Sequence, residues 1–174
     1  MYLISLYFDE NTQDKLKYLM KKVAEKSGNP YMIEANVPPH ITIAMFDTKE
    51  ENKVIELFDT KIHEIGKGML QWVSIGVFNP RVLFLAPVLN EYLHSLSVFA
   101  NEILSFVGDI SISPYYLPMQ WMPHTTIAKK LSVEQMQIAF KTVQNNFRML
   151  EGTVTKIGLA KTNPYQEIRN WDLE

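Results

Sequence analysis

Apolar positions along the chain recur with two periods, and their succession predicts the order of helices and strands. Spacing of three and four residues is typical of a buried helix face, whereas two-residue alternation is typical of a half-buried strand. The helical period predicts helices over about 10–27, from a capping box at 48–51 to the glycines at 66–68, over 89–107, and from 132 to about 149. Apolar runs and alternation predict strands at about 2–8, 40–45, 69–78, 81–88, 123–130, 152–161 and 165–173. Residues 108–122 show no period and are expected to be irregular.

A histidine and a threonine two residues apart occur in both halves of the chain. The stretch Pro39-His40-Ile41-Thr42-Ile43-Ala44 returns as Pro123-His124-Thr125-Thr126-Ile127-Ala128, and five of the six positions match. In each predicted strand the His and the Thr of the motif share one face, because side chains alternate between the two faces of a strand.

The similarity between the halves extends beyond these two stretches. In both halves a capping box begins eight residues after the motif histidine, at Thr48 and at Ser132. The two histidines are 84 residues apart, and so are the Asn-Pro turns at 79–80 and 163–164. An internal duplication explains this shared spacing.

The order of elements predicts an α+β protein with two similar lobes. Each lobe is expected to be a mainly antiparallel sheet covered by helices, and a pseudo-twofold axis is expected to relate the lobes across a central cleft. We expect a single bilobal domain over 1–174, with halves of about 1–80 and 81–174 and the last strand paired back onto the first lobe.

Composition narrows the possible partners and chemistry. The formal charge of −2 argues against binding of long duplex nucleic acid, which needs many phosphate-neutralising cations, but permits a nucleotide or a short RNA end as substrate. The chain has no Cys, which excludes disulfides and thiolate chemistry. It also has no signal-peptide pattern and no apolar run that could span a membrane, so we expect a cytoplasmic monomer.

The paired motif suggests acid–base chemistry at a phosphodiester. If the two strands face one cleft, one imidazole can accept a proton from an attacking hydroxyl while the other protonates the leaving oxygen. The hydroxyls of Thr42 and Thr126 can donate hydrogen bonds to phosphoryl oxygens. A single His-x-Thr is usually an ordinary surface or capping pair, but two copies in matched contexts favour a catalytic site. Neither motif histidine has a second ligand at the spacing of a zinc site, so no metal is expected.

These paired motifs, residues 39–43 and 123–127, resemble those of the 2H phosphoesterase superfamily, which includes 2′-5′ RNA ligase-like proteins and cyclic nucleotide phosphodiesterases. The resemblance covers nearly the whole chain. It implies a bilobal fold and action without metal or other cofactor on 2′,3′-cyclic, 1″,2″-cyclic or 2′-5′ phosphodiester linkages. By motif position, it implies that His40 and His124 are the catalytic pair and that Thr42 and Thr126 contact the phosphate.

Two lysines depart from the pattern of the RNA ligase-like members, which often carry an Arg shortly after the second motif. Lys129 and Lys130 occupy these positions. A lysine ammonium cannot form the two parallel hydrogen bonds of a guanidinium, so another 2H subgroup stays open. Both are candidates for substrate binding, and strict alternation predicts that Lys130 rather than Lys129 shares the face of His124.

Aromatic residues near the motifs are further candidates for substrate binding. Regular alternation places Phe46 on the face of His40, and Tyr115, Tyr116 and Trp121 precede the second motif. Such rings can stack on a nucleobase, although packing at the cleft edge or in the core is the commoner role. Because loops often carry specificity, we expect residues 108–122 to select the substrate.

Two classes of function remain open from the sequence. The first is a metal-independent phosphodiesterase or phosphotransferase that uses the histidine pair, with RNA ligation as the reverse reaction. The second is a binding module that holds a nucleotide or RNA end in the same cleft without turnover. Binding can use the same hydrogen-bond donors as catalysis, so the motif alone does not separate them.

Overall fold

All 174 residues are described by the computed structural model, and they form a mixed α+β fold, as the sequence predicts. The strands are β1 (Tyr2–Phe8), β2 (Ile41–Thr48), β3 (Gly68–Phe78), β4 (Val82–Pro87), β5 (Ile110–Ile112), β6 (Thr125–Ala128), β7 (Leu150–Lys161) and β8 (Gln166–Asp172). The helices are α1 (Glu10–Ser27), α2 (Tyr31–Glu34), α3 (Glu51–Lys61), α4 (Glu91–Leu104) and α5 (Val133–Asn146), with 3-10 turns at Ile62–Glu64 and Pro114–Tyr116. The elements α2 and β5 are too short for periodicity to reveal them.

One of the two predicted capping boxes forms. The Ser132 side chain accepts from the backbone N–H of Gln135, and the Gln135 side chain accepts from the N–H of Ser132. The box predicted at Thr48 is wrong, because β2 continues through Thr48 and α3 begins only at Glu51. The extra strand residues carry β2 far enough to pair with β5.

All eight strands are antiparallel and belong to one sheet, in the order β5-β2-β1-β7-β3-β4-β6, with β8 also paired to β7. The sequence predicts two separate sheets, but the long strand β7 joins them. Its first residues pair with β3 from Leu150 to Val154, and the rest pairs with β1 as far as Lys161. A strand of 12 residues is long enough to be shared by two groups of neighbours.

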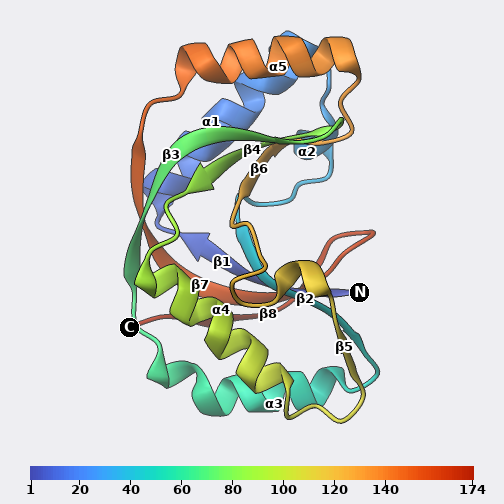
Figure 1. Cartoon of the computed structure of the whole chain (residues 1–174), viewed down its shortest axis with the longest axis vertical. Helices are drawn as coiled ribbons and strands as arrows, with labels where there is room; N and C mark the ends of the chain where they lie inside the picture. Colours follow the sequence, from blue (N-terminus) through green and yellow to red (C-terminus); the bar gives the residue numbers. More distant parts are fainter.

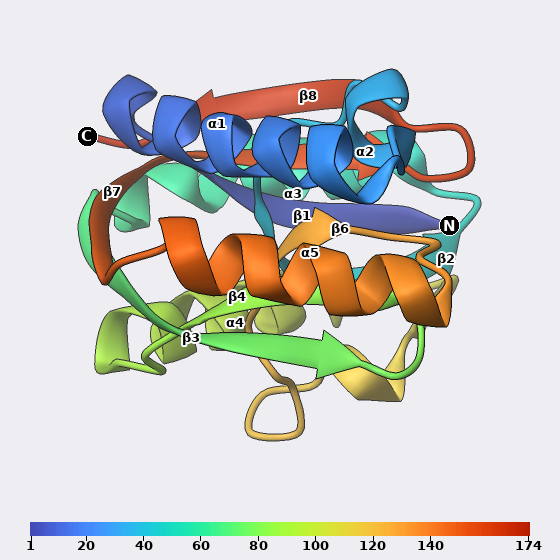
Figure 2. The same cartoon turned by 90° about the horizontal axis from the view of Figure 1, so that it is seen from above.

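The two halves of the sequence exchange strands and helices. The strand β3 follows the first motif in sequence but pairs with β4, whereas β7 follows the second motif but pairs with β1. Helices follow the same rule: α1 packs with α5 beside β3, β4 and β6, and α3 packs with α4 at the other end (Figure 1). Figure 2 shows α1 and α5 side by side. The two halves that the sequence duplication predicts are therefore interleaved in space, because each half contributes strands and helices to both ends of the molecule.

A single hydrophobic core runs through this shared sheet, and none of the helices has the length and apolar composition to span a membrane. Trp72 in β3 is fully buried, and its indole N–H donates to the Thr125 hydroxyl at 3.0 Å. Thr125 is the one motif position that differs between the copies, and it faces this core. Its hydroxyl therefore has a structural role as the acceptor for Trp72.

Replacing Thr125 by Val should lower the free energy of unfolding by about 1–3 kcal/mol, because the buried indole N–H of Trp72 loses its acceptor while the side-chain volume is kept. Urea unfolding measures the change. Thr125→Ser keeps the hydroxyl and removes one methyl group, so it should cost about 1 kcal/mol. A Val variant as stable as the wild type would contradict the structural role of this hydroxyl.

Candidate functional site

The two motif histidines occupy equivalent positions and are held in the same way. His40 immediately precedes β2 and His124 immediately precedes β6. The Nδ1 atom of His40 lies 2.8 Å from the carbonyl oxygen of Pro38, and that of His124 lies 2.9 Å from the carbonyl oxygen of Met122. A carbonyl oxygen only accepts, so Nδ1 must carry the proton in both rings. Each imidazole is therefore oriented through Nδ1, and its Nε2 stays available for proton transfer.

Both histidines and both motif threonines line one cavity of about 470 Å³. This volume lies within the range of small-molecule sites. The sheet brings the residues together because β2 and β6 lie near opposite ends of its strand order and open onto the same cavity. In the sequence the two histidines are 84 positions apart, and so are the two threonines. In the structure these four candidate catalytic residues are neighbours.

A β-bulge follows the threonine in each motif strand. In β2, Thr42 pairs with Ser5 but Ala44 pairs with Ile4, so Ile43 is an extra residue. In β6, Thr126 and Ala128 pair with consecutive residues of β4 in the same way, which makes Ile127 the extra residue. A bulge reverses the alternation of side chains beyond it.

The bulge in β6 corrects the expected positions of the two lysines. Lys129 lines the cavity with His124 and Thr126, whereas Lys130 does not. The backbone of Lys130 has a φ of 60°, and its ammonium lies 4.2 Å from the ring centre of Tyr31. Strict alternation predicted the reverse, and it fails because the strand is bulged and then ends at Ala128.

The bulge in β2 similarly corrects the position predicted for Phe46. This ring is 1% exposed, belongs to the core and stacks on Tyr2 at a centroid distance of 5.4 Å. Met45 lines the cavity instead, at the place equivalent to Lys129. Phe46 is therefore a core residue and does not line the cavity.

The hydroxyls of the two threonines have different neighbours. The Thr42 hydroxyl oxygen lies 3.4 Å from that of Ser5, which is longer than a strong O–H···O hydrogen bond. Thr126 pairs across the sheet with Phe84, whose side chain has no polar group. Neither hydroxyl is committed to a strong partner, so both can donate to a ligand in the cavity.

The histidine rings also have different aromatic neighbours. Two rings lie close to His124: Phe78 edge-on at 4.8 Å and Phe84 at 5.3 Å between centroids. The ring of Tyr7 lies 6.3 Å from that of His40. These distances are typical of packed aromatic pairs.

Burial is the main cause that lowers the pKa of both histidines below the ordinary value. For His40, the positive charges of His124 and Lys129 lower the pKa further, against the raising effect of the hydrogen bond to Pro38. For His124, the charge of Lys129 adds to burial, against the hydrogen bond to Met122. Both rings are therefore mostly neutral at neutral pH in the free protein.

A second cavity of about 470 Å³ adjoins the first and is formed with the segment before β6. It is lined by Tyr115, which is 80% exposed, and by Trp121, which is 7% exposed. Tyr116 lines both cavities and is therefore better placed than Tyr115 or Trp121 to contact a bound molecule. The cavities also share residues of both motif strands, namely Met45, His124, Thr126 and Lys129. The segment predicted to select the substrate thus borders the histidine pair.

Several cavity residues have no signal in the sequence. Tyr31 comes from α2, and Tyr165 comes from the turn between β7 and β8. The Tyr165 hydroxyl lies 3.0 Å from that of Tyr7, and burial is the main cause that raises the pKa of both phenols. Only the fold brings these segments to the motif strands.

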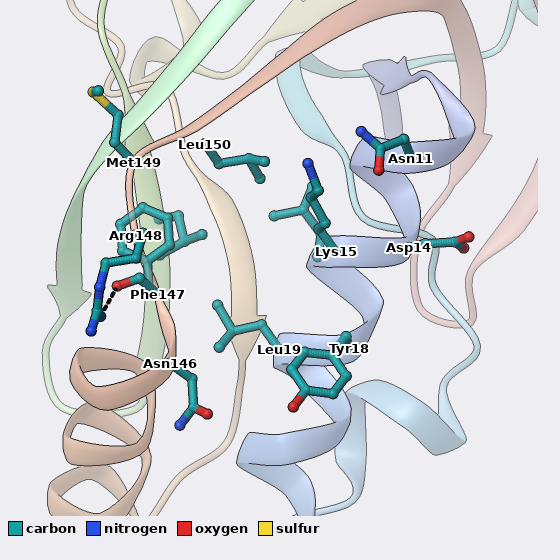
Figure 3. Close-up of a pocket in the computed structure, with 12 residues that line it drawn as sticks. Asn11, Asp14, Lys15, Tyr18, Leu19, Asn146, Phe147, Arg148, Met149 and Leu150 are labelled. Atoms are coloured by element: carbon teal, nitrogen blue, oxygen red, sulfur yellow. Dashed lines mark hydrogen bonds between the residues drawn. The ribbon is translucent and has the colours of Figure 1, made fainter.

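A third cavity, of about 490 Å³, contains none of the motif residues (Figure 3). It lies between α1 and the segment that leads from α5 into β7, and Figure 3 shows Leu19 and Leu150 within it. Arg148 at its edge donates to the carbonyl oxygen of Phe147 at 2.8 Å. Its titratable side chains are Asp14, Lys15, Tyr18 and Arg148, and it has no histidine, so this cavity is a poorer candidate for acid–base catalysis near neutral pH. No group of three or more His, Cys, Asp or Glu side chains that could hold a metal ion occurs in the chain.

In ¹⁵N-labelled protein, NMR should show neutral His40 and His124 as Nδ1–H tautomers with pKa values below about 6.5, the ordinary value for histidine. His40→Ala and His124→Ala assign the two signals. Inorganic phosphate should raise both pKa values, because an anion in the cavity stabilises the imidazolium. An Nε2–H tautomer at either residue would contradict the anchoring through Nδ1.

Solved structures with the same fold were found at low sequence identity. A protein of Thermus thermophilus has 17% identity and a TM-score of 0.65, with 99% of this chain and 97% of that chain covered. A phosphoesterase has 14% identity and a TM-score of 0.61, with 99% and 97% covered. LigT of Escherichia coli, solved with ATP, has 14% identity and a TM-score of 0.59, with 99% and 96% covered.

The sequence comparisons differ in outcome. No curated protein sequence matches the chain. The family model of the 2′-5′ RNA ligase superfamily matches residues 12–166, which include both motif strands and the whole of β2 to β7. The chain therefore belongs to the 2′-5′ RNA ligase superfamily, the 2H phosphoesterases.

Proposed function

We propose that this protein is a phosphodiesterase or phosphotransferase that acts on cyclic phosphates or 2′-5′-linked nucleotides by acid–base catalysis with two histidines. The observation that carries the proposal is the pair of imidazoles in one cavity, each anchored through Nδ1 and accompanied by a motif threonine. This arrangement supplies two proton-transfer groups with defined orientation.

The proposed reaction is a displacement at phosphorus. The Nε2 of one neutral imidazole accepts the proton of a water or ribose hydroxyl, whose oxygen then forms a bond to phosphorus. The bond from phosphorus to the leaving oxygen breaks, and the Nε2–H of the other, protonated imidazole donates its proton to that oxygen. The two histidines have exchanged protonation states at the end, and proton exchange with water restores them.

The threonines and Lys129 stabilise the charge on the phosphoryl group in this mechanism. Each motif threonine lies two residues after its histidine, and Thr42 and Thr126 line the same cavity as the histidines. Hydrogen-bond donors that are fixed before the reaction lower the energy of the transition state without reorganising. The ammonium of Lys129 supplies the positive charge that attracts an anionic substrate.

Substrate binding also helps to create the acid. Both pKa values are lowered in the free protein, so few molecules at neutral pH carry the one protonated histidine that the reaction needs. The negative charge of a bound phosphodiester favours the imidazolium and opposes the effect of Lys129. The protein therefore gains its acid when the substrate is bound.

The two adjoining cavities support substrates with a group on each side of the phosphate. They share His124, Thr126 and Lys129 and diverge toward Tyr165 on one side and Tyr115 on the other. A 2′-5′-linked nucleotide can place one nucleoside in each, and a cyclic phosphate needs only one. Tyrosine rings in both cavities suit stacking on a base.

Purified protein should hydrolyse a 2′,3′-cyclic nucleotide or a 2′-5′ dinucleotide in excess EDTA, and His40→Ala or His124→Ala should lower kcat by about 10²–10⁴-fold. His63→Ala is the matched control, because His63 lies in the turn after α3 and outside the cavity, and it should leave kcat unchanged. Full turnover in both motif variants would refute the mechanism. Nucleotide binding measured by calorimetry, without product after long incubation, would instead establish the binding module.

Lys129→Met should raise the KM by about tenfold at low salt, since it removes the cation that faces the substrate, and the effect should shrink at high salt. Lys130→Met is the matched control and should change the KM far less, because Lys130 lines neither of the two cavities. Steady-state kinetics at two salt concentrations measure both. A larger effect at Lys130 would contradict the placement of the two lysines.

A further inference from the structure

Each motif threonine lies at the end of a cross-strand row of residues that contains a glycine. In one row Gly76 of β3 pairs with Phe84 of β4, which pairs with Thr126 of β6. Residues directly opposite each other in an antiparallel sheet project on the same face. These three residues therefore face the cavity side of the sheet together.

The equivalent row on the other side has the same form. Gly158 of β7 pairs with Ser5 of β1, which pairs with Thr42 of β2. The exchanged strands β3 and β7 thus supply the glycine of each row, and the two rows reach the cavity from opposite sides.

An aromatic ring occupies the space above each glycine. A Cβ atom added at Gly76 would overlap the ring of Phe84, and one added at Gly158 would lie 2.6 Å from a ring carbon of Tyr7 and would also overlap the side chain of Asn170. Phe84 is 3% exposed and Tyr7 is 6% exposed. Both rings are therefore confined between the strand and their other neighbours.

The backbone does not require glycine at either position. Gly28 is the glycine with a positive φ in this chain, so Gly76 and Gly158 adopt conformations that other residues reach without strain. Glycine within a strand weakens it, which calls for a reason such as the close approach of another group. Here that group is an aromatic ring.

Each ring above a glycine also faces a motif histidine. Phe84 lies 5.3 Å from His124, and Tyr7 lies 6.3 Å from His40. On the first side, Phe78 packs at 4.3 Å from Phe84 and closes the group of rings around His124. Because Phe84 leans over Gly76, its ring leaves Thr126 uncovered for a ligand.

We propose that Gly76 and Gly158 are positioning residues: each provides the space in which one aromatic ring packs against a motif histidine without covering the motif threonine of the same row. This role rests on the proposed function for its effect on turnover, whereas the packing itself is independent of any activity. A methyl group at either position would push the ring toward the cavity and alter the orientation of one imidazole.

Gly76→Ala should lower kcat for the cyclic or 2′-5′ substrate by at least about tenfold while the KM changes little, because small displacements of a catalytic group cost much in rate. In NMR spectra of the same variant, the signals of His124 should shift in position and in titration midpoint while those of His40 do not. Gly158→Ala should show the reverse pattern. This selectivity separates a positioning effect from general loss of stability.

Gly68→Ala is the matched control. Gly68 lies in the same strand as Gly76, and an added Cβ would likewise meet an aromatic ring, that of Tyr92. Tyr92 contacts neither histidine, and its hydroxyl donates to the carbonyl oxygen of Gly66. We expect Gly68→Ala to leave kcat and both histidine signals unchanged.

A smaller side chain at position 84 tests the contact directly and remains informative if Gly76→Ala folds poorly. Phe84→Leu removes the ring that the new methyl group would strike, so Gly76→Ala should cost much less turnover in the Phe84→Leu background than in the wild type. Equal losses in both backgrounds, or equal losses for Gly68→Ala and Gly76→Ala, would overturn the proposal. Unchanged His124 signals in Gly76→Ala would overturn it as well. A wild-type protein without turnover would refute the proposed function alone, because the NMR comparison still decides the packing.

Discussion

The pairing of β7 with both β1 and β3 is the constraint on which the site depends. This one strand hydrogen-bonds to β1, the inner end of the group β5-β2-β1, and to β3, the inner end of the group β3-β4-β6, so the two groups cannot separate without breaking the sheet. The length of β7 also sets where these two groups of strands meet. The outer strands β2 and β6 then open onto one cavity, and the histidines at their starts become neighbours. Two side chains held at the starts of strands of one sheet are positioned more rigidly than two side chains held on mobile loops.

Small repeated features of the motif strands decide which side chains face the cavity. The bulges at Ile43 and Ile127 turn the strands by one residue, which brings Met45 and Lys129 into the cavity and sends Phe46 into the core. The carbonyl groups of Pro38 and Met122 fix the two imidazoles through the same atom. Because these features occur on both sides, the halves of the site have the same geometry before any ligand binds.

The two sides nevertheless differ in chemistry. Thr42 has the Ser5 hydroxyl beside it and His40 faces a tyrosine, whereas His124 and Thr126 lie near phenylalanine rings and Lys129. A phosphate placed between the histidines therefore meets a more polar wall on one side and an apolar wall with a cation on the other. Unequal surroundings are what allow two like groups to take different proton-transfer roles.

The sequence by itself determined the fold class, the order of nearly all elements and the pairing of each His with its Thr on one strand face. These features depend on local periodicity and on a repeat of 84 residues, both of which are visible without the fold. Only the tertiary structure decided that the halves exchange β3 and β7, that Lys129 rather than Lys130 lines the cavity, and that Tyr31, Tyr116 and Tyr165 surround it. A bulge depends on how a strand registers with its neighbour, and a cavity depends on segments far apart in the chain. Neither leaves a period in the sequence, which is why local pattern could not reveal them.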